Sequence, residues 1–217
     1  MIWDLIAKAF GALTYRPIAP ALPGAEFHDR RKTAARSHDH GKRKPPTGIC
    51  LHQTACLLGE RPERWDSVGA HIGITRGGKV IWLHSFDRLV WHGNGWNQTT
   101  IGIEIDGLYA GVEGVESTVW NDPRTPHREW GMDLTHEAEV AARDVIRWIC
   151  QTAPGIKTIV AHRQSSASRR SDPGQAIWQA VAIPARDELE LTTPTLTVGT
   201  GQRIPEAWDP RCKGVAY

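Results

Sequence analysis

Residues 159–174 read IVAHRQSSASRRSDPG and hold the most informative pattern in the chain. The first three, Ile159-Val160-Ala161, form an apolar run typical of a buried strand, and His162 follows directly. Asp172 comes ten residues after His162 and precedes Pro173-Gly174, a pair that fixes a turn. A histidine at a strand end and an aspartate on a rigid turn can converge on one metal ion.

The same setting recurs near residue 50, where Ile49-Cys50-Leu51 predicts a short buried strand and His52 follows it. With His162 and Asp172, His52 completes a set of two imidazoles and one carboxylate. Zn²⁺ accepts nitrogen and oxygen ligands, and catalytic zinc sites keep a fourth position for water. These residues therefore predict a site for one zinc ion.

Further motifs lie between these two strands. Residues 69–74 read GAHIGI, and residues 79–83 form a second apolar segment. The turn Arg76-Gly77-Gly78 between them predicts a hairpin. Residues 90–93 read VWHG and residues 101–105 read IGIEI. One such motif is weak evidence, but the whole series in a fixed order is specific.

In this order, together with LHQTA at residues 51–55, the motifs resemble those of zinc-dependent N-acetylmuramoyl-L-alanine amidases of the type-2 amidase and peptidoglycan-recognition-protein superfamily. The resemblance spans roughly residues 48–182. It implies a single α/β domain with a central mixed β-sheet flanked by helices, a zinc site in a cleft at the sheet edge, and extended N- and C-terminal segments. It also implies hydrolysis of the amide bond between N-acetylmuramic acid and L-alanine of the stem peptide.

The resemblance assigns roles to five residues. It implies that His52, His162 and Asp172 bind one Zn²⁺. Glu104 matches the general base of the family, which takes a proton from water and passes it to the leaving amine. Arg170 falls where the muropeptide-recycling members carry lysine, so we expect it to stabilise the oxyanion with the metal. Arginine keeps the positive charge but presents a rigid fork.

Other side chains in these motifs are candidates for the substrate cleft. His71 and His92 would support the zinc ligands or line the cleft, with a purely structural role as the alternative. The chain has ten Trp but only three Phe and three Tyr. Indole rings pack in cores and also stack on sugars. The tryptophans expected in the glycan or peptide groove, each with a core position as the alternative, are Trp91, Trp96, Trp120 and Trp130.

Changes in composition along the chain predict three segments. Residues 48–190 form the amidase domain, and residues 191–217 form an extended tail. Residues 1–47 form an extension that opens with an amphipathic helix pattern over residues 3–13. We find no internal repeat.

Charge is unevenly distributed along the chain. The formal net charge is +2, but residues 28–44 alone carry seven Lys or Arg against two Asp, a net charge of +5. We expect these residues to form a solvated arm, with weak contact to an anionic wall or membrane surface as the second interpretation. The near-zero total and the lack of a nucleic-acid-binding motif predict no nucleic-acid partner.

Hydrophobic periodicity predicts the remaining elements. Residues 99–105 and 158–161 form strands, and residues 135–150 and 174–182 form helices. Residues 107–131 form a long loop, a kind of segment that is often functional. The four Cys have neither metal-ribbon nor redox spacing, and one disulfide remains the alternative to free thiols.

The resemblance leaves three functions open. The first is a phage-type endolysin, favoured by the basic segment, the proline-rich tails and the long loop with its tryptophans. The second is a cytoplasmic recycling amidase that acts on soluble anhydro-muropeptides. The aspartate ligand and its spacing from His162 resemble the recycling enzymes more closely. The third is a non-catalytic peptidoglycan-binding module, disfavoured because the three ligands and Glu104 are all present.

The N-terminus lacks the pattern of a signal peptide. We therefore expect synthesis in the cytoplasm, action on the cell wall after release for an endolysin, and a monomeric protein.

Overall fold

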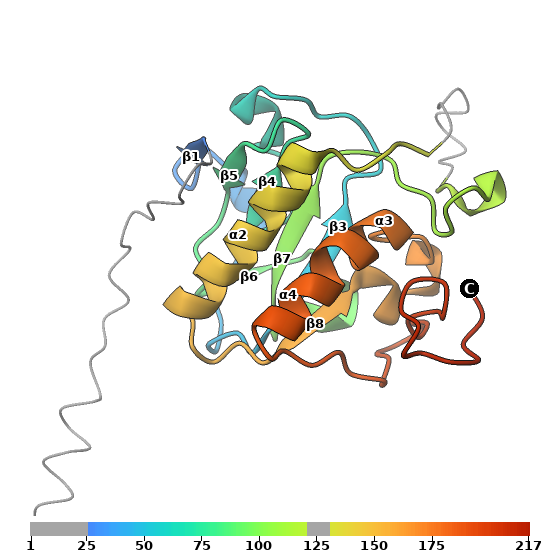
Figure 1. The fold of residues 1–217 in the computed structure, drawn as a ribbon. Helices are drawn as coiled ribbons and strands as arrows, with labels where there is room; N and C mark the ends of the chain where they lie inside the picture. The colour runs from blue at the N-terminus through green and yellow to red at the C-terminus, as the bar shows by residue number, and fades with distance from the viewer. Residues whose placement is uncertain (1–25, 121–130) are drawn as a thin grey trace, which may run out of the picture.

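The computed structural model describes residues 26–120 and 131–217. Its main sheet has six strands in the order β1-β5-β4-β7-β3-β8 (Figure 1). These strands are β1 (Phe27–Asp29), β3 (Gly48–Gln53), β4 (Ile72–Ile74), β5 (Val80–Trp82), β7 (Thr100–Ile105) and β8 (Thr158–Ala161). A second sheet pairs β2 (Asp39–Lys42) with β6 (Arg88–Val90). The helix predicted over residues 3–13, and Trp130, lie outside the described residues.

The centre of the main sheet is parallel and buried. Strands β4, β7, β3 and β8 run parallel, whereas β5 pairs antiparallel with β4 in the predicted hairpin. All six residues of β3 are buried, as expected for a parallel strand covered on both faces. The predicted fold class, an α/β domain with a central mixed sheet, is confirmed.

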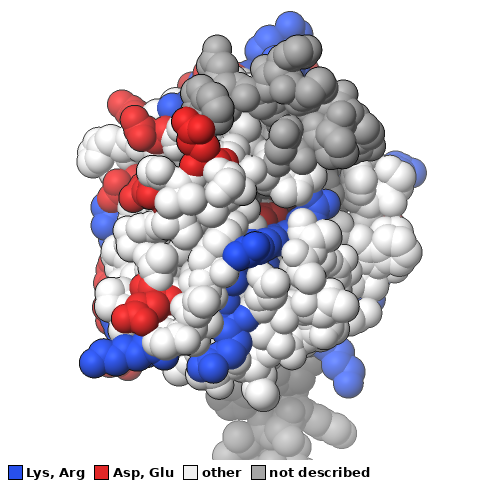
Figure 2. Space-filling model, turned by 90° about the vertical axis from the view of Figure 1, so that its right-hand side faces the viewer, with Lys and Arg blue, Asp and Glu red and all other residues white. Residues whose placement is uncertain are grey.

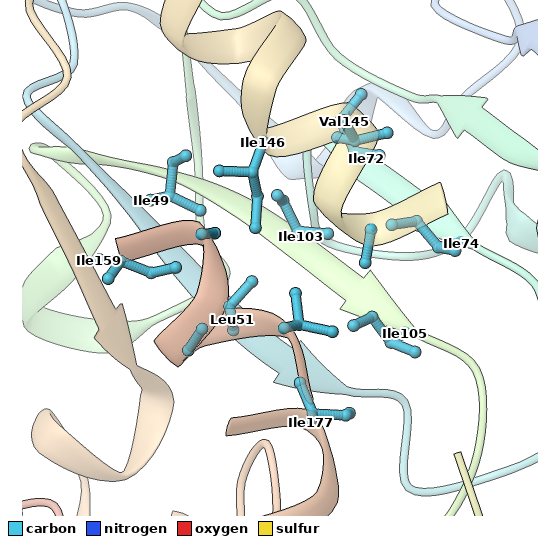
Figure 3. Packing of buried hydrophobic residues seen from close by; sticks show 14 of the residues in the cluster. Ile49, Leu51, Ile72, Ile74, Ile103, Ile105, Val145, Ile146, Ile159 and Ile177 are labelled. Atoms are coloured by element: carbon cyan, nitrogen blue, oxygen red, sulfur yellow. The ribbon is translucent and has the colours of Figure 1, made fainter. Parts of the chain in front are cut away.

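The longer helices cover one face of the main sheet (Figure 1). They are α2 (His136–Thr152) and a continuous run of α3 (Gln175–Ile177), a π-helical turn (Trp178–Ala182) and α4 (Ile183–Glu188). Figure 3 shows Ile49 and Ile103 of the sheet packed with Ile146 of α2 in the core. Because side chains alternate along a strand, the even-numbered His52 and Glu104 project from the opposite face.

Helix α2 begins as predicted and ends two residues beyond the predicted Cys150. The N–H of Ala138 donates to Thr135 Oγ1 at 3.4 Å, which caps the first turn. The residues of the predicted buried stripe are all buried, namely Ala138, Ala142, Val145, Ile146 and Ile149. This stripe holds α2 against the sheet.

The basic segment, residues 28–44, is part of the folded domain, and the prediction of a solvated arm is wrong. Strand β1 pairs with β5, and the Arg30 guanidinium donates to both Asp66 carboxylate oxygens, at 2.9 and 2.5 Å. Arg43 donates to three backbone carbonyl groups, those of Phe86, Asn97 and Thr100. These partners lie 36 to 57 residues away in the sequence. Local charge patterning therefore does not reveal them.

The tail, residues 191–217, runs across the domain as turns and extended chain. Ile204 and Trp208 are buried, and the Tyr217 hydroxyl lies 2.7 Å from Ser171 Oγ. The tail thus contributes to the core and reaches the loop that precedes α3.

Five of the eight tryptophans within the described residues belong to the core. The buried ones are Trp65, Trp82, Trp148, Trp178 and Trp208. All four cysteine thiols are free. Within residues 26–120 and 131–217, no helix is long and apolar enough to cross a membrane.

Candidate metal centre

Three side chains from three elements meet where β3 and β8 end. His52 lies on β3, His162 follows β8 directly, and Asp172 ends the loop before α3. His162 Nδ1 lies 2.9 Å from both His52 Nδ1 and Asp172 Oδ2, and His52 Nδ1 lies 3.9 Å from Asp172 Oδ2. All three residues are buried. The strands are parallel neighbours with Leu51 beside Ala161, so the histidines that follow meet at one edge.

A chain of hydrogen bonds orients the His52 ring. His92 Nε2 lies 3.1 Å from the Thr100 carbonyl oxygen, which can only accept, so this nitrogen carries the proton. His92 Nδ1 then accepts from His52 Nε2 over 3.0 Å. His52 Nδ1 therefore carries a lone pair, which is directed toward His162 and Asp172. Burial lowers the pKa of His52 well below its usual range and that of His92 to about 3, so both rings are neutral.

Asp172 is held by the backbone beside His52. The Gln53 N–H donates to Asp172 Oδ1 at 3.0 Å, which leaves Oδ2 toward the histidines. The Gln53 side chain donates to the Ser171 carbonyl oxygen at 2.6 Å and accepts from the Tyr109 N–H at 2.6 Å. Gln53 therefore ties β3 to the loop that carries the carboxylate.

The donor set fits a zinc ion. Zinc binds nitrogen and oxygen ligands at about 2.0–2.2 Å, so ligand atoms up to roughly 4 Å apart can share one ion. His52 Nδ1, His162 Nδ1 and Asp172 Oδ2 satisfy this condition. The structure thus brings the three predicted ligands together in an arrangement that one Zn²⁺ can share.

A second group, Cys50, His52 and His92, also has its ligand atoms within 4.8 Å of one another. Here His52 Nε2 already donates to His92 Nδ1. Burial, followed by the carboxylates of Asp172 and Glu104, raises the pKa of the Cys50 thiol well above its usual range. Because metals bind the thiolate, the geometry favours the set that contains Asp172.

Glu104 stands opposite His52 in the register of β3 and β7. Its Oε2 atom is buried and has no hydrogen-bond partner in the part of the chain that the structure describes. Burial, and next the Asp172 carboxylate, raise the pKa of Glu104 well above its usual range, while Arg169 opposes this shift. A buried carboxylate oxygen without a partner is costly and marks a candidate functional group.

Two adjacent arginines before Asp172 have different surroundings. Arg170, the residue predicted to stabilise the oxyanion, is exposed. Its guanidinium donates to the Tyr217 carbonyl oxygen at 2.5 Å and lies 4.3 Å from the centre of the Tyr217 ring. The charge of Arg169 instead acts on His52 and Glu104. Tyr217 thus holds Arg170 at the surface, whereas the charge of Arg169 acts toward the site.

Figure 2 shows the charges on one face of the molecule. Lys and Arg side chains gather across its centre, next to a small recessed acidic surface. Positive charge thus lies close to acidic groups on this face.

His71 and Gly102 have structural roles behind the site. His71 Nδ1 accepts from the Gly102 N–H at 3.0 Å, and His71 Nε2 donates to the Arg88 carbonyl oxygen at 3.0 Å. Both ring nitrogens are therefore engaged. A Cβ atom on Gly102 would lie 2.5 Å from His92 Cγ, so glycine leaves the space that the His92 ring occupies.

The described tryptophans of the predicted groove differ in exposure. Trp91 is 63% exposed, and its ring stacks on His40 with the ring centres 3.8 Å apart. Trp96 and Trp120 are half-buried. The Arg169 guanidinium lies 5.6 Å from the centre of the Trp120 ring. Trp120 therefore contacts Arg169, whereas Trp91 faces solvent.

Gln53 and Arg169 are contributors that the sequence pattern did not predict. Each is adjacent to a predicted residue, His52 in one case and Arg170 in the other. The Arg169-Arg170 pair before Asp172 was a signal for a cation at the site. The pattern does not say which arginine points inward, because that depends on the turn and on the distant Tyr217.

The fold and the site define an α/β protein with a candidate metal centre of two histidines and one aspartate near a half-buried glutamate. The family model Amidase_2, described as N-acetylmuramoyl-L-alanine amidase, matches residues 42–175, and the chain belongs to this family. The predicted membership is thus confirmed. A search against curated proteins returns no match.

Several solved structures share the fold. The endolysin amidase LysCS from Clostridium intestinale URNW is 13% identical, with 77% of this chain and 97% of that chain covered and a TM-score of 0.52. Drosophila PGRP-LB is 14% identical, with 77% and 96% covered and a TM-score of 0.53. Bumblebee PGRP-SA is 16% identical, with 78% and 99% covered and a TM-score of 0.52. At these identities the similarity shows the fold alone.

Proposed function

We propose that the chain is a zinc-dependent amidase that cuts the bond between N-acetylmuramic acid and L-alanine in peptidoglycan. The observation that carries this proposal is the buried cluster of His52, His162 and Asp172 beside the unpartnered carboxylate oxygen of Glu104. Membership of the amidase family supports the choice of bond. The nitrogen and oxygen donor set supports the choice of metal.

Each group at the site has a role in amide hydrolysis. Zinc, when bound, supplies Lewis-acid polarisation of a carbonyl and lowers the pKa of water. Glu104 takes a proton from the attacking water and gives it to the leaving amine, a role that a carboxyl group with a raised pKa suits. Arg169 presents positive charge where negative charge develops on the carbonyl oxygen. His92 keeps the His52 ring in the tautomer that leaves Nδ1 free to bind the metal.

We place the substrate in the polymeric cell wall, as for a phage-type endolysin. LysCS, which shares the fold, is described as an endolysin. The exposed Trp91 ring, stacked on His40, offers a flat aromatic surface that suits a sugar ring. In this role the protein is made in the cytoplasm and acts on the wall after release.

The metal assignment is tested by zinc analysis of the purified full chain. We expect one zinc ion per chain, and its loss in His52→Ala and in Asp172→Ala but not in the control His136→Ala, whose side chain is exposed. Full zinc occupancy in both ligand variants would refute the ligand assignment.

The activity is tested by product mass after incubation with a defined muramyl tripeptide. We expect a free peptide that begins with L-alanine and an intact sugar. A protein that holds no metal and releases no such peptide is not the proposed enzyme.

The source of the substrate needs a separate comparison. The purified chain is given intact sacculi in one arm and soluble anhydro-muropeptides in the other, and the released peptide is quantified in each. Clearing of sacculi supports the endolysin role. Turnover confined to the soluble anhydro-muropeptides would assign the chain to wall recycling instead.

A further inference from the structure

A cavity of about 440 Å³ lies away from the metal centre. Its lining residues are Arg31, Ala34, Arg36, Asp39, His84 and Arg88. They come from the segment around β1 and β2 and from the chain between β5 and β6. β1 forms one edge of the main sheet, and β8, which leads to the metal centre, forms the other (Figure 1). The cavity thus shares no residue with the proposed active site.

The charge of this cavity is positive. Three arginines and one aspartate line it. Arg88 is paired with Asp39, its Nε lying 2.9 Å from both carboxylate oxygens, and Arg31 is paired with Asp29 at 2.6 Å. Arg36 is exposed, and among residues 26–120 and 131–217 no acidic side chain forms an ion pair with it. A cation at the wall of a cavity, with no ion-pair partner among the described residues, favours an anionic ligand.

His84 provides an independent observation that points to a ligand. The residue is 5% exposed, yet its Nε2 atom is buried without a hydrogen-bond partner in the described chain. Burial lowers the pKa of His84, so the ring is neutral near pH 7 and can offer one N–H. An unpaired buried nitrogen carries a desolvation cost that a bound acceptor would remove.

We propose that this cavity is a binding site for a phosphate group, held by Arg36 with the other arginines and His84 that line it. A phosphate offers several acceptor oxygens in a tetrahedral arrangement, so guanidinium and imidazole donors can bind it from different sides. Its source is either free phosphate or the phosphodiester of an anionic polymer. This site gives the basic segment, residues 28–44, a ligand that is separate from the peptide bond cut at the metal centre.

The test uses the purified full chain and two probes, inorganic phosphate and a short glycerol phosphodiester oligomer. Binding is measured by calorimetry and by the imidazole ¹⁵N signal of His84. We expect a saturable 1:1 isotherm and a shift of the His84 signal with at least one probe. A response to the oligomer but not to phosphate identifies a phosphodiester polymer as the source. A response to phosphate alone identifies the free ion.

Arg36→Gln is the informative variant because Arg36 is exposed and its loss removes no ion pair of the described fold. We expect its Kd to rise about tenfold, the effect of losing one charge-assisted hydrogen bond. Arg61→Gln is the matched control, since it removes the same charge from an exposed arginine that does not line the cavity. Its Kd should stay unchanged.

Three results would overturn the site. They are the absence of saturable binding with both probes, an unchanged Kd in Arg36→Gln, and equal weakening in Arg61→Gln, which would indicate diffuse charge attraction. The result does not depend on the amidase proposal, because the His84 signal is read separately from those of the metal-centre histidines. Phosphate binding in a protein without amide hydrolysis, or the reverse, would separate the two proposals.

Discussion

Glu104 is half-buried with one carboxylate oxygen buried and unpartnered in the described chain, and both properties follow from its position on β7. The strand alternates, so Ile103 and Ile105 enter the helix-covered core while Glu104 projects from the other face beside His52. Gly73, its neighbour on β4, has no side chain that could donate to it. The buried Oε2 atom therefore has no fixed partner among the described residues, which suits a group that exchanges protons during a reaction.

The Glu104→Gln variant tests this role. The amide keeps the shape of the side chain but cannot accept a proton from water. We expect turnover of a muramyl tripeptide to fall about 10²–10⁴-fold, while zinc content stays at the wild-type level because Glu104 is not among the ligands. Near-wild-type turnover would show that another group is the base. Loss of zinc would show that Glu104 supports the metal instead.

Arg169 and Arg170 allow a matched pair of variants. They are adjacent in the sequence, but only the charge of Arg169 acts toward the site, whereas Arg170 contacts Tyr217. Arg169→Gln removes the positive charge that acts on His52 and Glu104, and we expect a loss of kcat of about 10²-fold. Arg170→Gln removes only an exposed contact with Tyr217, so kcat should be retained. The reverse ranking in steady-state kinetics would restore Arg170 to the role that the family resemblance implies.

At the scale of elements, the strands that carry the metal ligands were predictable and the supports of the site were not. The apolar runs before His52 and His162 are local signals, and two parallel strands bring their ends together. The direction of Arg170 depends on Tyr217, 47 residues further along the chain. Likewise, the hydrogen bond from His52 to His92 joins two motifs 40 residues apart. Contacts of this kind depend on the folded arrangement and leave no periodic pattern.

Glycine within β4 illustrates how the face opposite the helices is packed. A Cβ atom at Gly73 would overlap the Trp65 ring, which is fully buried and has its Nε1–H bonded to the Gly59 carbonyl oxygen at 3.0 Å. We expect Gly73→Ala to lower the free energy of unfolding by about 1–3 kcal/mol because neither the strand nor the indole can move freely. Urea denaturation measures this change.

The control for this variant is Gly155→Ala, where the nearest atom to an added Cβ is the Pro46 carbonyl oxygen at 3.4 Å. Its free energy of unfolding should stay within about 0.5 kcal/mol of the wild type. Equal stability of Gly73→Ala and Gly155→Ala would mean that the β4 face is less tightly packed than the structure shows.

At the scale of the whole molecule, the segment before β3 is structural. Composition separates residues 28–44 from the rest because they are rich in basic residues, but several of their guanidinium groups bind acceptors within the domain. Arg43 is one example, since burial lowers its pKa to about 10 and its donors satisfy backbone carbonyl groups. Where a guanidinium group of this segment has such partners, its charge stabilises the fold, whereas Arg36, which forms no ion pair with the described acidic residues, is left for a ligand.

Truncation tests whether residues 28–44 are a structural part of the domain or a dispensable arm. A chain that begins at Gly48 loses β1, the pair between Arg30 and Asp66, and all donors of Arg43. We expect its free energy of unfolding to drop by about 3 kcal/mol or more, since several charge-assisted hydrogen bonds disappear. β5 also becomes an exposed edge that favours aggregation. A chain that begins at Glu26 keeps every contact that the structure describes, so its melting temperature is the reference for the chain that begins at Gly48. A stable, active protein that begins at Gly48 would show that the segment is a dispensable arm.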